Sequence, residues 1–156
     1  VLAPASGGGL IGGVAAAVKH LRRDVRVVAV EPAVTPRLTR SMQAGHAVTV
    51  DAGTSIADGL LAVRAGDVTF AHVTALVDEI VTVTDDVVRD TVRWLFEEVR
   101  LVAEPSGAAA PAAARVSAPT TWSRDGRSFR DTPGTTVAII SGGNVATEAF
   151  ARYVGA

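Results

Sequence analysis

Short apolar segments alternate along the chain with longer segments in which apolar residues recur at helical spacing. The short segments are rich in β-branched residues, which is typical of strands covered on both faces. They predict strands at residues 1–3, 25–30, 48–50, 80–83 and 136–140. The longer segments predict helices at residues 10–21, 34–44, 70–77, 84–99 and 104–114, with a last helix after residue 144. Strands that alternate with helices predict a three-layer α/β/α domain with a mostly parallel sheet.

Some residues refine these elements. Thr84 is expected to cap the helix that follows it, because a hydroxyl can accept a hydrogen bond from a free backbone N–H group of the first turn. Pro105 suits the first turn of its helix, whereas Pro111 would shorten or kink it. The polar residues 117–134 predict a surface loop. The core-facing stripe expected on residues 84–99 comprises Val88, Val92, Leu95, Phe96 and Val99.

Two glycine-rich loops follow predicted strands. Ser6-Gly7-Gly8-Gly9-Leu10 lies between a strand and the start of a helix, and Ser141-Gly-Gly-Asn144 follows the last strand. Consecutive glycines allow backbone N–H groups to surround a phosphate, and the positive end of a helix dipole favours its charge. Ligands of such sheets bind beyond the carboxyl ends of the strands. One such loop would be explained equally well as a simple turn, but two with a serine each favour a shared ligand.

The first loop also fits a dinucleotide site. Residues 7–12 satisfy G-x-G-x-x-G, and Glu31 follows Gly12 by 19 residues at the end of the next strand. That spacing is typical of a nicotinamide or flavin dinucleotide site, in which the acidic residue binds the ribose. By spacing alone, an oxidoreductase domain is a fair interpretation.

Composition limits the class of protein. Of 156 residues, 48% are apolar and 20% are charged, and the mean hydropathy is +0.31, which fits one globular domain over residues 1–156. The net charge of −1 argues against nucleic-acid and membrane-surface partners, and no apolar run is long enough to cross a membrane, so we expect a cytoplasmic protein. Cysteine is absent, which excludes disulfides, zinc–thiolate sites and thiol catalysis.

Two features of the sequence are unusual, namely its basic residues and its first residues. Lysine and arginine together number 15, yet Lys19 is the single lysine. The chain opens at Val1, on residues that look like the end of a buried strand. We therefore expect the C-terminal portion of a longer protein.

Six segments between residue 1 and residue 144 give the chain a family resemblance. They are Ser6-Gly-Gly-Gly-Leu-Ile-Gly-Gly13, Val27-Val-Ala-Val-Glu-Pro32, Ser55-Ile-Ala-Asp-Gly59, Val83-Thr-Asp-Asp86, Glu104-Pro-Ser-Gly-Ala-Ala109 and Ser141-Gly-Gly-Asn144. In their order and spacing they resemble the threonine/serine dehydratase family, which consists of pyridoxal-phosphate enzymes of the tryptophan-synthase-β fold type and includes serine racemase. The resemblance implies the large cofactor-binding domain of that fold, incomplete, with a phosphate cradle instead of a dinucleotide site.

The resemblance assigns a role to each matched position. The backbone amides of Ser6, Gly7, Gly8, Gly9 and Leu10 would hold the cofactor phosphate, with Ser6 in place of a glycine that relatives often have. Ser141 would hydrogen-bond the pyridine nitrogen, which suits β-elimination over transamination. Gly59 would lie against the cofactor ring near its hydroxyl. Glu104 would be an acid close to the ring, or equally well a carboxylate that stabilises a helix N-terminus.

The resemblance also implies what the chain lacks. Some relatives bind a divalent cation through an acid at the position of Glu31 and an aspartate six residues later, where this chain has Arg37. A cation would face a positive charge there, so we expect no metal site. The Schiff-base lysine of the family lies upstream of the matched segments. Lys19 is about ten residues into the first helix, roughly 15 Å along its axis, and is expected to be a surface residue.

These implications predict half of an enzyme. Together with a missing N-terminal half, it would eliminate water from L-threonine or L-serine, giving an α-keto acid and ammonia, and it would form a homodimer. The chain alone would contain no catalytic residue and would be inactive as a dehydratase. Two alternatives stay open: a dinucleotide-binding oxidoreductase domain, and a non-catalytic fragment that retains the pyridoxal-phosphate fold.

Overall fold

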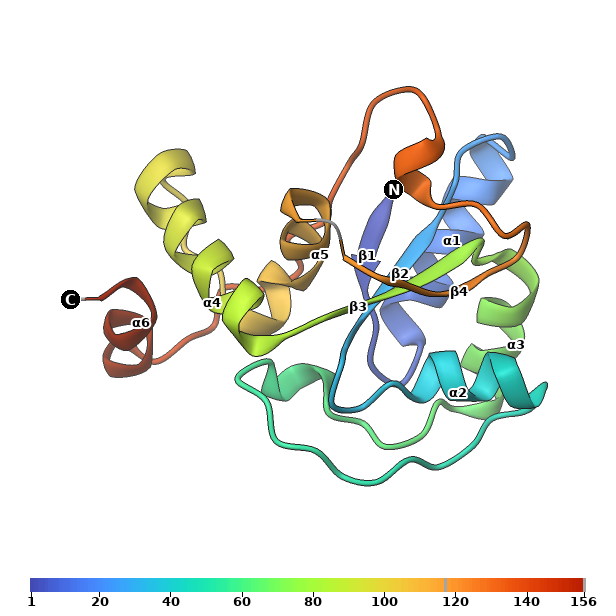
Figure 1. Ribbon diagram of the computed structural model, residues 1–156, viewed down its shortest axis with the longest axis horizontal. Helices are drawn as coiled ribbons and strands as arrows, with labels where there is room; N and C mark the ends of the chain where they lie inside the picture. Colours follow the sequence, from blue (N-terminus) through green and yellow to red (C-terminus); the bar gives the residue numbers. More distant parts are fainter. Residues whose placement is uncertain (117, 156) are drawn as a thin grey trace.

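The computed structural model describes residues 1–116 and 118–155 (Figure 1). Its strands are β1 (Leu2–Pro4), β2 (Val28–Pro32), β3 (Glu79–Val83) and β4 (Thr120–Ser123). Its α-helices are α1 (Gly9–Leu21), α2 (Arg37–Ala44), α3 (Asp67–Leu76), α4 (Asp85–Trp94), α5 (Pro105–Arg115) and α6 (Thr147–Val154). Short 3₁₀ turns are found at η1 (Asp58–Leu60) and η3 (Phe129–Asp131), and a π-helical turn, η2 (Leu95–Val99), extends α4.

The four strands form one sheet in the order β1-β2-β3-β4. β1, β2 and β3 are parallel, and β4 pairs antiparallel with β3 at the edge. Successive residues of β2 point to opposite faces, so that Val28 and Val30 join one core and Ala29 joins the other. Both faces of β2 are buried, as the continuous apolar run predicts.

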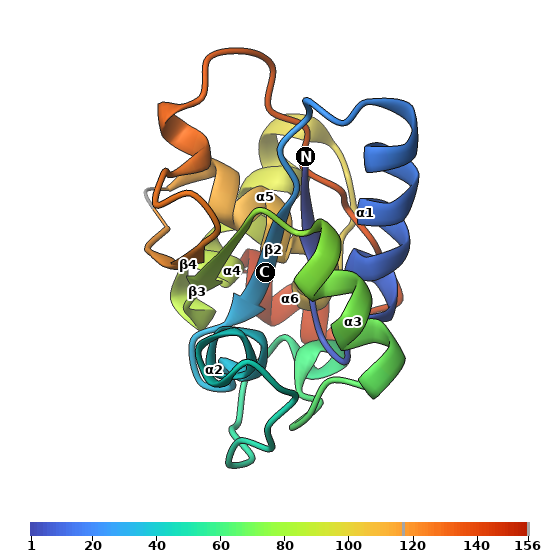
Figure 2. The same ribbon diagram turned by 90° about the vertical axis from the view of Figure 1, so that its right-hand side faces the viewer.

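Helices cover both faces of the sheet. α1 and α3 pack together on one face, whereas α4 and α5 pack together on the other (Figures 1 and 2). α5 runs directly against β1, β2 and β3, and its alanines allow the close approach. α6 lies beyond α4 and contacts that helix rather than the sheet. The predicted α/β class with three layers and a mostly parallel sheet is confirmed. No helix within the described ranges is long and apolar enough to span a membrane.

Several details differ from the sequence-based expectations. Thr84 is the N-terminal cap residue of α4, but its side chain makes no capping hydrogen bond. Of the expected loop 117–134, residue 117 lies outside the described residues, and the rest contains β4 and η3. The stripe after Thr84 is buried only as far as Leu95, because the π turn carries Phe96 and Val99 to the outside, where they are 39% and 41% exposed. Pro111 lies inside α5, which nevertheless continues to Arg115.

Two expected strands are present only as single bridges. Residues 48–50 contribute one antiparallel bridge between Thr49 and Arg64, and residues 136–140 contribute one parallel bridge between Leu2 and Ala138. Residues 137–139 nevertheless run along β1, since the Leu2 N–H donates to the Val137 carbonyl at 2.8 Å and the Ile139 N–H to the Leu2 carbonyl at 3.0 Å. The loop at Ser141 therefore follows directly beside the end of β1.

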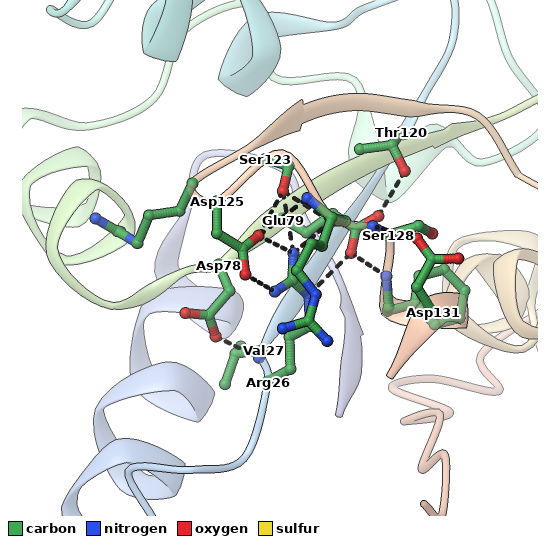
Figure 3. A network of polar contacts seen from close by, with 12 residues as sticks. Arg26, Val27, Asp78, Glu79, Thr120, Ser123, Asp125, Ser128 and Asp131 are labelled. Atoms are coloured by element: carbon green, nitrogen blue, oxygen red, sulfur yellow. Dashed lines mark hydrogen bonds and ion pairs between the residues drawn. The ribbon is translucent and has the colours of Figure 1, made fainter. Parts of the chain in front are cut away.

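A buried carboxylate holds the segment after β4 against the sheet (Figure 3). Glu79 of β3 is fully buried, and it accepts hydrogen bonds from the Thr120 hydroxyl and the Phe129 N–H group, each at 2.6 Å. Its other close partner is the guanidinium of Arg26, at 3.2 Å. Arg26 also pairs with Asp125 at 2.9 Å. Glu79 thus joins β3, the segment before β2 and the turn at η3.

The Glu79→Gln variant is expected to lower the free energy of unfolding by about 2–3 kcal/mol, because it removes the charge from a buried set of charge-assisted hydrogen bonds. Urea unfolding followed by circular dichroism measures this change. The matched control is Asp86→Asn, which breaks an exposed ion pair with Arg89 and should change stability by less than about 1 kcal/mol. Equal effects of the two substitutions would contradict the structural role of Glu79.

Candidate active site

The loop after β1 presents backbone N–H groups at the start of α1. Gly8 is the N-terminal cap of α1 and has a left-handed backbone with φ 96°, which favours glycine. The first N–H groups of an α-helix have no intrahelical acceptor. The loop and the helix dipole together therefore form a site suited to an anion.

The carbonyls of this loop are bonded elsewhere. Gly7 O accepts hydrogen bonds from the Thr69 hydroxyl at 2.6 Å and from the Gly66 N–H at 3.2 Å, and Gly8 O accepts one from the Gly12 N–H at 2.9 Å. In a trans peptide the C=O of one residue and the N–H of the next point in opposite directions. Because these carbonyls face their donors, the N–H groups of Gly8 and Gly9 face away from them, and repulsive carbonyl oxygens do not crowd the anion position.

The second glycine loop is packed against α5. A Cβ atom added to Gly107 would overlap the backbone of Gly142, and one added to Gly142 would overlap the carboxylate of Glu104. The Glu104 N–H also donates to the Gly142 carbonyl at 3.2 Å. This close approach fixes Ser141 beside the N-terminus of α5.

Gly59 lies in η1 and faces the same helix end. Its N–H group donates to the hydroxyl of Ser106 at 3.0 Å. A Cβ atom added to Gly59 would lie 3.0 Å from that hydroxyl oxygen, so a side chain here would push the two segments apart. Ser106 is buried and is the second residue of α5. The glycine thus allows η1 to approach the start of α5.

These segments enclose one cavity of about 210 Å³. All eight residues predicted as cofactor contacts line it. Three further lining residues, Pro4, Leu60 and Ser106, were not predicted from the sequence. Ser106 had the clearest signal, because it is a serine in the first turn of the helix that Glu104 begins. The residues that line the cavity are Pro4, Ser6, Gly7, Gly8, Gly9, Leu10, Gly59, Leu60, Glu104, Ser106 and Ser141.

The electrostatics of the cavity come from backbone dipoles. α1 and α5 both begin at the cavity, and the lining residues in the described part of the chain include no lysine or arginine. Two helix N-termini favour a negatively charged group. Glu104 supplies a half-buried carboxylate at the side of α5, opposite in sign to these dipoles. The arrangement suits a ligand with an anionic end at α1 and a neutral or positively charged end toward Glu104.

Glu31 and Arg37 form a buried pair behind this cavity. Both are fully buried, and Arg37 Nη1 lies 3.7 Å from Glu31 Oε2. The Glu31 carboxylate accepts hydrogen bonds from the Leu38 N–H at 2.9 Å, and from the Thr39 N–H and hydroxyl at 2.9 and 2.7 Å. Burial raises the pKa of Glu31, whereas these hydrogen bonds and the charge of Arg37 oppose the shift. No cluster of three or more metal-ligating side chains occurs within residues 1–116 and 118–155.

Lys19 lies at the other end of α1. Its ammonium group pairs with Asp78 at 2.7 Å and donates to the Val25 carbonyl at 2.9 Å. Its side chain is 18% exposed, which is less than expected for a surface lysine. Lys19 lines a different cavity, of about 580 Å³, between the ends of α1 and α3.

Comparisons with known proteins support this fold and show its family. A family model described as "Pyridoxal-phosphate dependent enzyme" matches residues 1–142. The L-threonine ammonia-lyase of Thermotoga maritima is 34% identical over 155 residues, which are 99% of this chain and 36% of that protein. A serine racemase of Oryza sativa subsp. indica is 40% identical over 114 residues, 73% of this chain and 33% of that protein. The structure of maize serine racemase gives a TM-score of 0.83 at 34% identity, covering 97% of this chain and 44% of that one.

The mostly parallel sheet with a glycine-rich loop after β1 is thus the fold of pyridoxal-phosphate dependent enzymes. The chain belongs to the family of pyridoxal-phosphate dependent enzymes, and its relatives include threonine ammonia-lyases and serine racemases. The family and the fold type predicted from six motifs are confirmed. The chain spans about a third of the length of these curated relatives.

Proposed function

We propose that this chain is the part of a threonine/serine dehydratase that holds the phosphate and pyridine ends of pyridoxal phosphate. The complete enzyme would eliminate water from L-threonine or L-serine, giving an α-keto acid and ammonia. The observation that carries this proposal is the single cavity lined by all eight predicted contact residues. In the same proposal, residues 1–156 form one domain of a cytoplasmic homodimer.

Different residues of the cavity would bind different parts of pyridoxal phosphate. Pyridoxal phosphate, when bound, supplies an electron sink for negative charge at the substrate α-carbon. The N–H groups of residues 6–10 would hold its phosphate. The Ser141 hydroxyl would donate to or accept from the pyridine nitrogen, and Gly59 would leave space for the ring. Glu104, packed against Gly142, would hold negative charge near the ring.

A dinucleotide site is the weaker alternative. The G-x-G-x-x-G reading requires Glu31 to bind a ribose. Glu31 is instead fully buried, and its oxygens already accept hydrogen bonds from Leu38 and Thr39. A ribose hydroxyl would have to displace these donors, and this cost favours pyridoxal phosphate over NAD or a flavin.

The chain alone should lack dehydratase activity. Its single lysine is held by Asp78 and the Val25 carbonyl at the far end of α1 from the glycine loop. The coverage of the relatives supports a catalytic lysine in a part of the full-length protein outside this chain. A non-catalytic relative that lacks this lysine altogether is the remaining alternative.

Three measurements on the full-length protein and on the 156-residue chain test the proposal. The full-length protein should bind pyridoxal phosphate, seen as visible absorbance, and should produce α-keto acid from L-threonine or L-serine, whereas the chain alone should produce none. NAD should not change its intrinsic fluorescence. Keto-acid production by the isolated chain would contradict the proposal that the catalytic lysine lies outside this chain. Binding of NAD but not of pyridoxal phosphate would favour the oxidoreductase.

A further inference from the structure

Arg37 is a large side chain with no contact to solvent. It is the first residue of α2 and is fully buried. The Nη1 atom donates to the carbonyls of Ala5 at 3.0 Å and Ser6 at 3.1 Å. The Nη2 atom donates to the Thr35 hydroxyl at 3.2 Å and to the Leu60 carbonyl. Three of these four acceptors are backbone carbonyls of the two segments that line the cavity.

Such a buried cation is unfavourable as a purely structural element. Burial lowers the pKa of Arg37, and the charge of Glu31 opposes this shift. The Nε atom is buried without a hydrogen-bond partner in the described structure. The guanidinium stays protonated, because arginine does not lose its proton in proteins. Apolar side chains of similar volume in place of both Arg37 and Glu31 would avoid the desolvation of two charges, so stability alone does not account for this pair.

The contacts of Arg37 orient one wall of the cavity. Because the Ala5 and Ser6 carbonyls face the guanidinium, the N–H groups of Ser6 and Gly7 point in the opposite direction. Thr69 and Gly12 fix the next two carbonyls of the loop in the same way. Arg37 thus sets the first two peptide planes of the cradle.

The same side chain connects the opposite wall. Leu60 directly follows Gly59 and itself lines the cavity. Its carbonyl accepts from the guanidinium that holds the Ser6 loop. The two walls therefore share one donor group, the guanidinium, whose charge is paired with the buried Glu31 carboxylate at 3.7 Å.

We propose that Arg37 is a positioning residue for the phosphate of pyridoxal phosphate. It turns the first amides of the cradle toward the anion and holds the segment after Gly59 at a fixed distance from the Ser6 loop, without touching the ligand. This inference rests on the proposed function, because it takes the ligand to be pyridoxal phosphate.

The test compares two ligands that differ only in the phosphate. Apo forms of the full-length wild-type, Arg37→Lys and Arg37→Met proteins are titrated with pyridoxal phosphate and with pyridoxal, and absorbance measures the two dissociation constants. Lysine keeps the charge but cannot make the forked contacts, and methionine keeps only the volume. We expect affinity for pyridoxal phosphate to fall about tenfold in Arg37→Lys and up to about a hundredfold in Arg37→Met, with pyridoxal affinity changed less than threefold.

The matched control is Arg40→Met, an arginine of the same helix that is exposed and lies outside the cavity. It should leave both dissociation constants unchanged. If Arg37→Met does not fold, the Arg37→Lys ratio alone decides. Equal losses for the two ligands at Arg37→Lys would assign Arg37 a purely structural role and overturn the inference. A wild-type protein that binds neither ligand would overturn the proposed function as well, so the two failures are distinguishable.

Discussion

The Gly8→Ala variant of the full-length protein is expected to bind pyridoxal phosphate about 30-fold or more weakly than wild type. Gly8 has φ 96°, a conformation that costs an L-residue about 1–2 kcal/mol. The new Cβ would also lie 2.9 Å from the Thr69 hydroxyl oxygen. That hydroxyl donates to the Gly7 carbonyl, so relief of the clash would turn a peptide plane of the cradle.

The same substitution should lower the free energy of unfolding by about 2–4 kcal/mol, the sum of backbone strain and overpacking. Titration with pyridoxal phosphate and urea unfolding measure the two effects. The control is Gly13→Ala, in the same helix, where an added Cβ meets nothing within 4 Å. It should stabilise the protein by about 0.5–1 kcal/mol and leave affinity unchanged. Wild-type affinity in Gly8→Ala would show that residues 6–10 do not hold the phosphate.

The Gly107→Ala variant is expected to displace the loop at Ser141. Helix propensity alone would make alanine more stable than glycine inside α5, by about 0.5–1 kcal/mol. The added Cβ, however, would overlap the backbone of Gly142, which cannot move without taking Ser141 with it. We expect a net loss of about 1–3 kcal/mol in stability and about tenfold in pyridoxal phosphate affinity, measured by the same titrations.

Gly12→Ala is the matched control for this position. Gly12 is also a buried glycine inside a helix, but an added Cβ would meet the His72 Cβ at 3.4 Å, an ordinary packing distance. It should leave affinity within twofold of wild type. A Gly107→Ala protein that is more stable than wild type and binds normally would contradict the close approach of α5 and the Ser141 loop.

The buried parallel strands could be predicted because their continuous apolar residues require apolar packing on both faces of the sheet. Val28, Ala29 and Val30 place apolar side chains on both faces of the strand, and only a central strand buries both faces. β4 could not be predicted in this way. Its residues 120–123 are polar or aromatic and no more than half buried, since an edge strand needs only one partner. The π turn after Trp94 could not be predicted either, because the apolar stripe was predicted for a regular α-helical spacing of residues.

The candidate site was predictable to the extent that glycine and serine mark it. Each predicted residue lines the cavity, because the backbone geometry that requires glycine also leaves a pattern in the sequence. Arg37 leaves no such pattern. Arginine is rarely buried without partners, and three of the hydrogen-bond acceptors of Arg37 are backbone carbonyls, of Ala5, Ser6 and Leu60, which every sequence supplies. From the sequence, Arg37 could be interpreted only as a charge that opposes a metal ion.

The single bridge between Leu2 and Ala138 gives the cavity a distinctive topology. One wall comes from the first ten residues of the chain and another from Ser141, so the site exists only when regions separated by more than a hundred residues have met. A ligand that contacts both walls acts as a reversible cross-link across this long loop. By linkage, a ligand at a hundred times its dissociation constant adds about 2.7 kcal/mol to the free energy of unfolding. Closing a long loop costs more conformational entropy than closing a short one, so the ligand stabilises the contact between segments whose approach is entropically most costly.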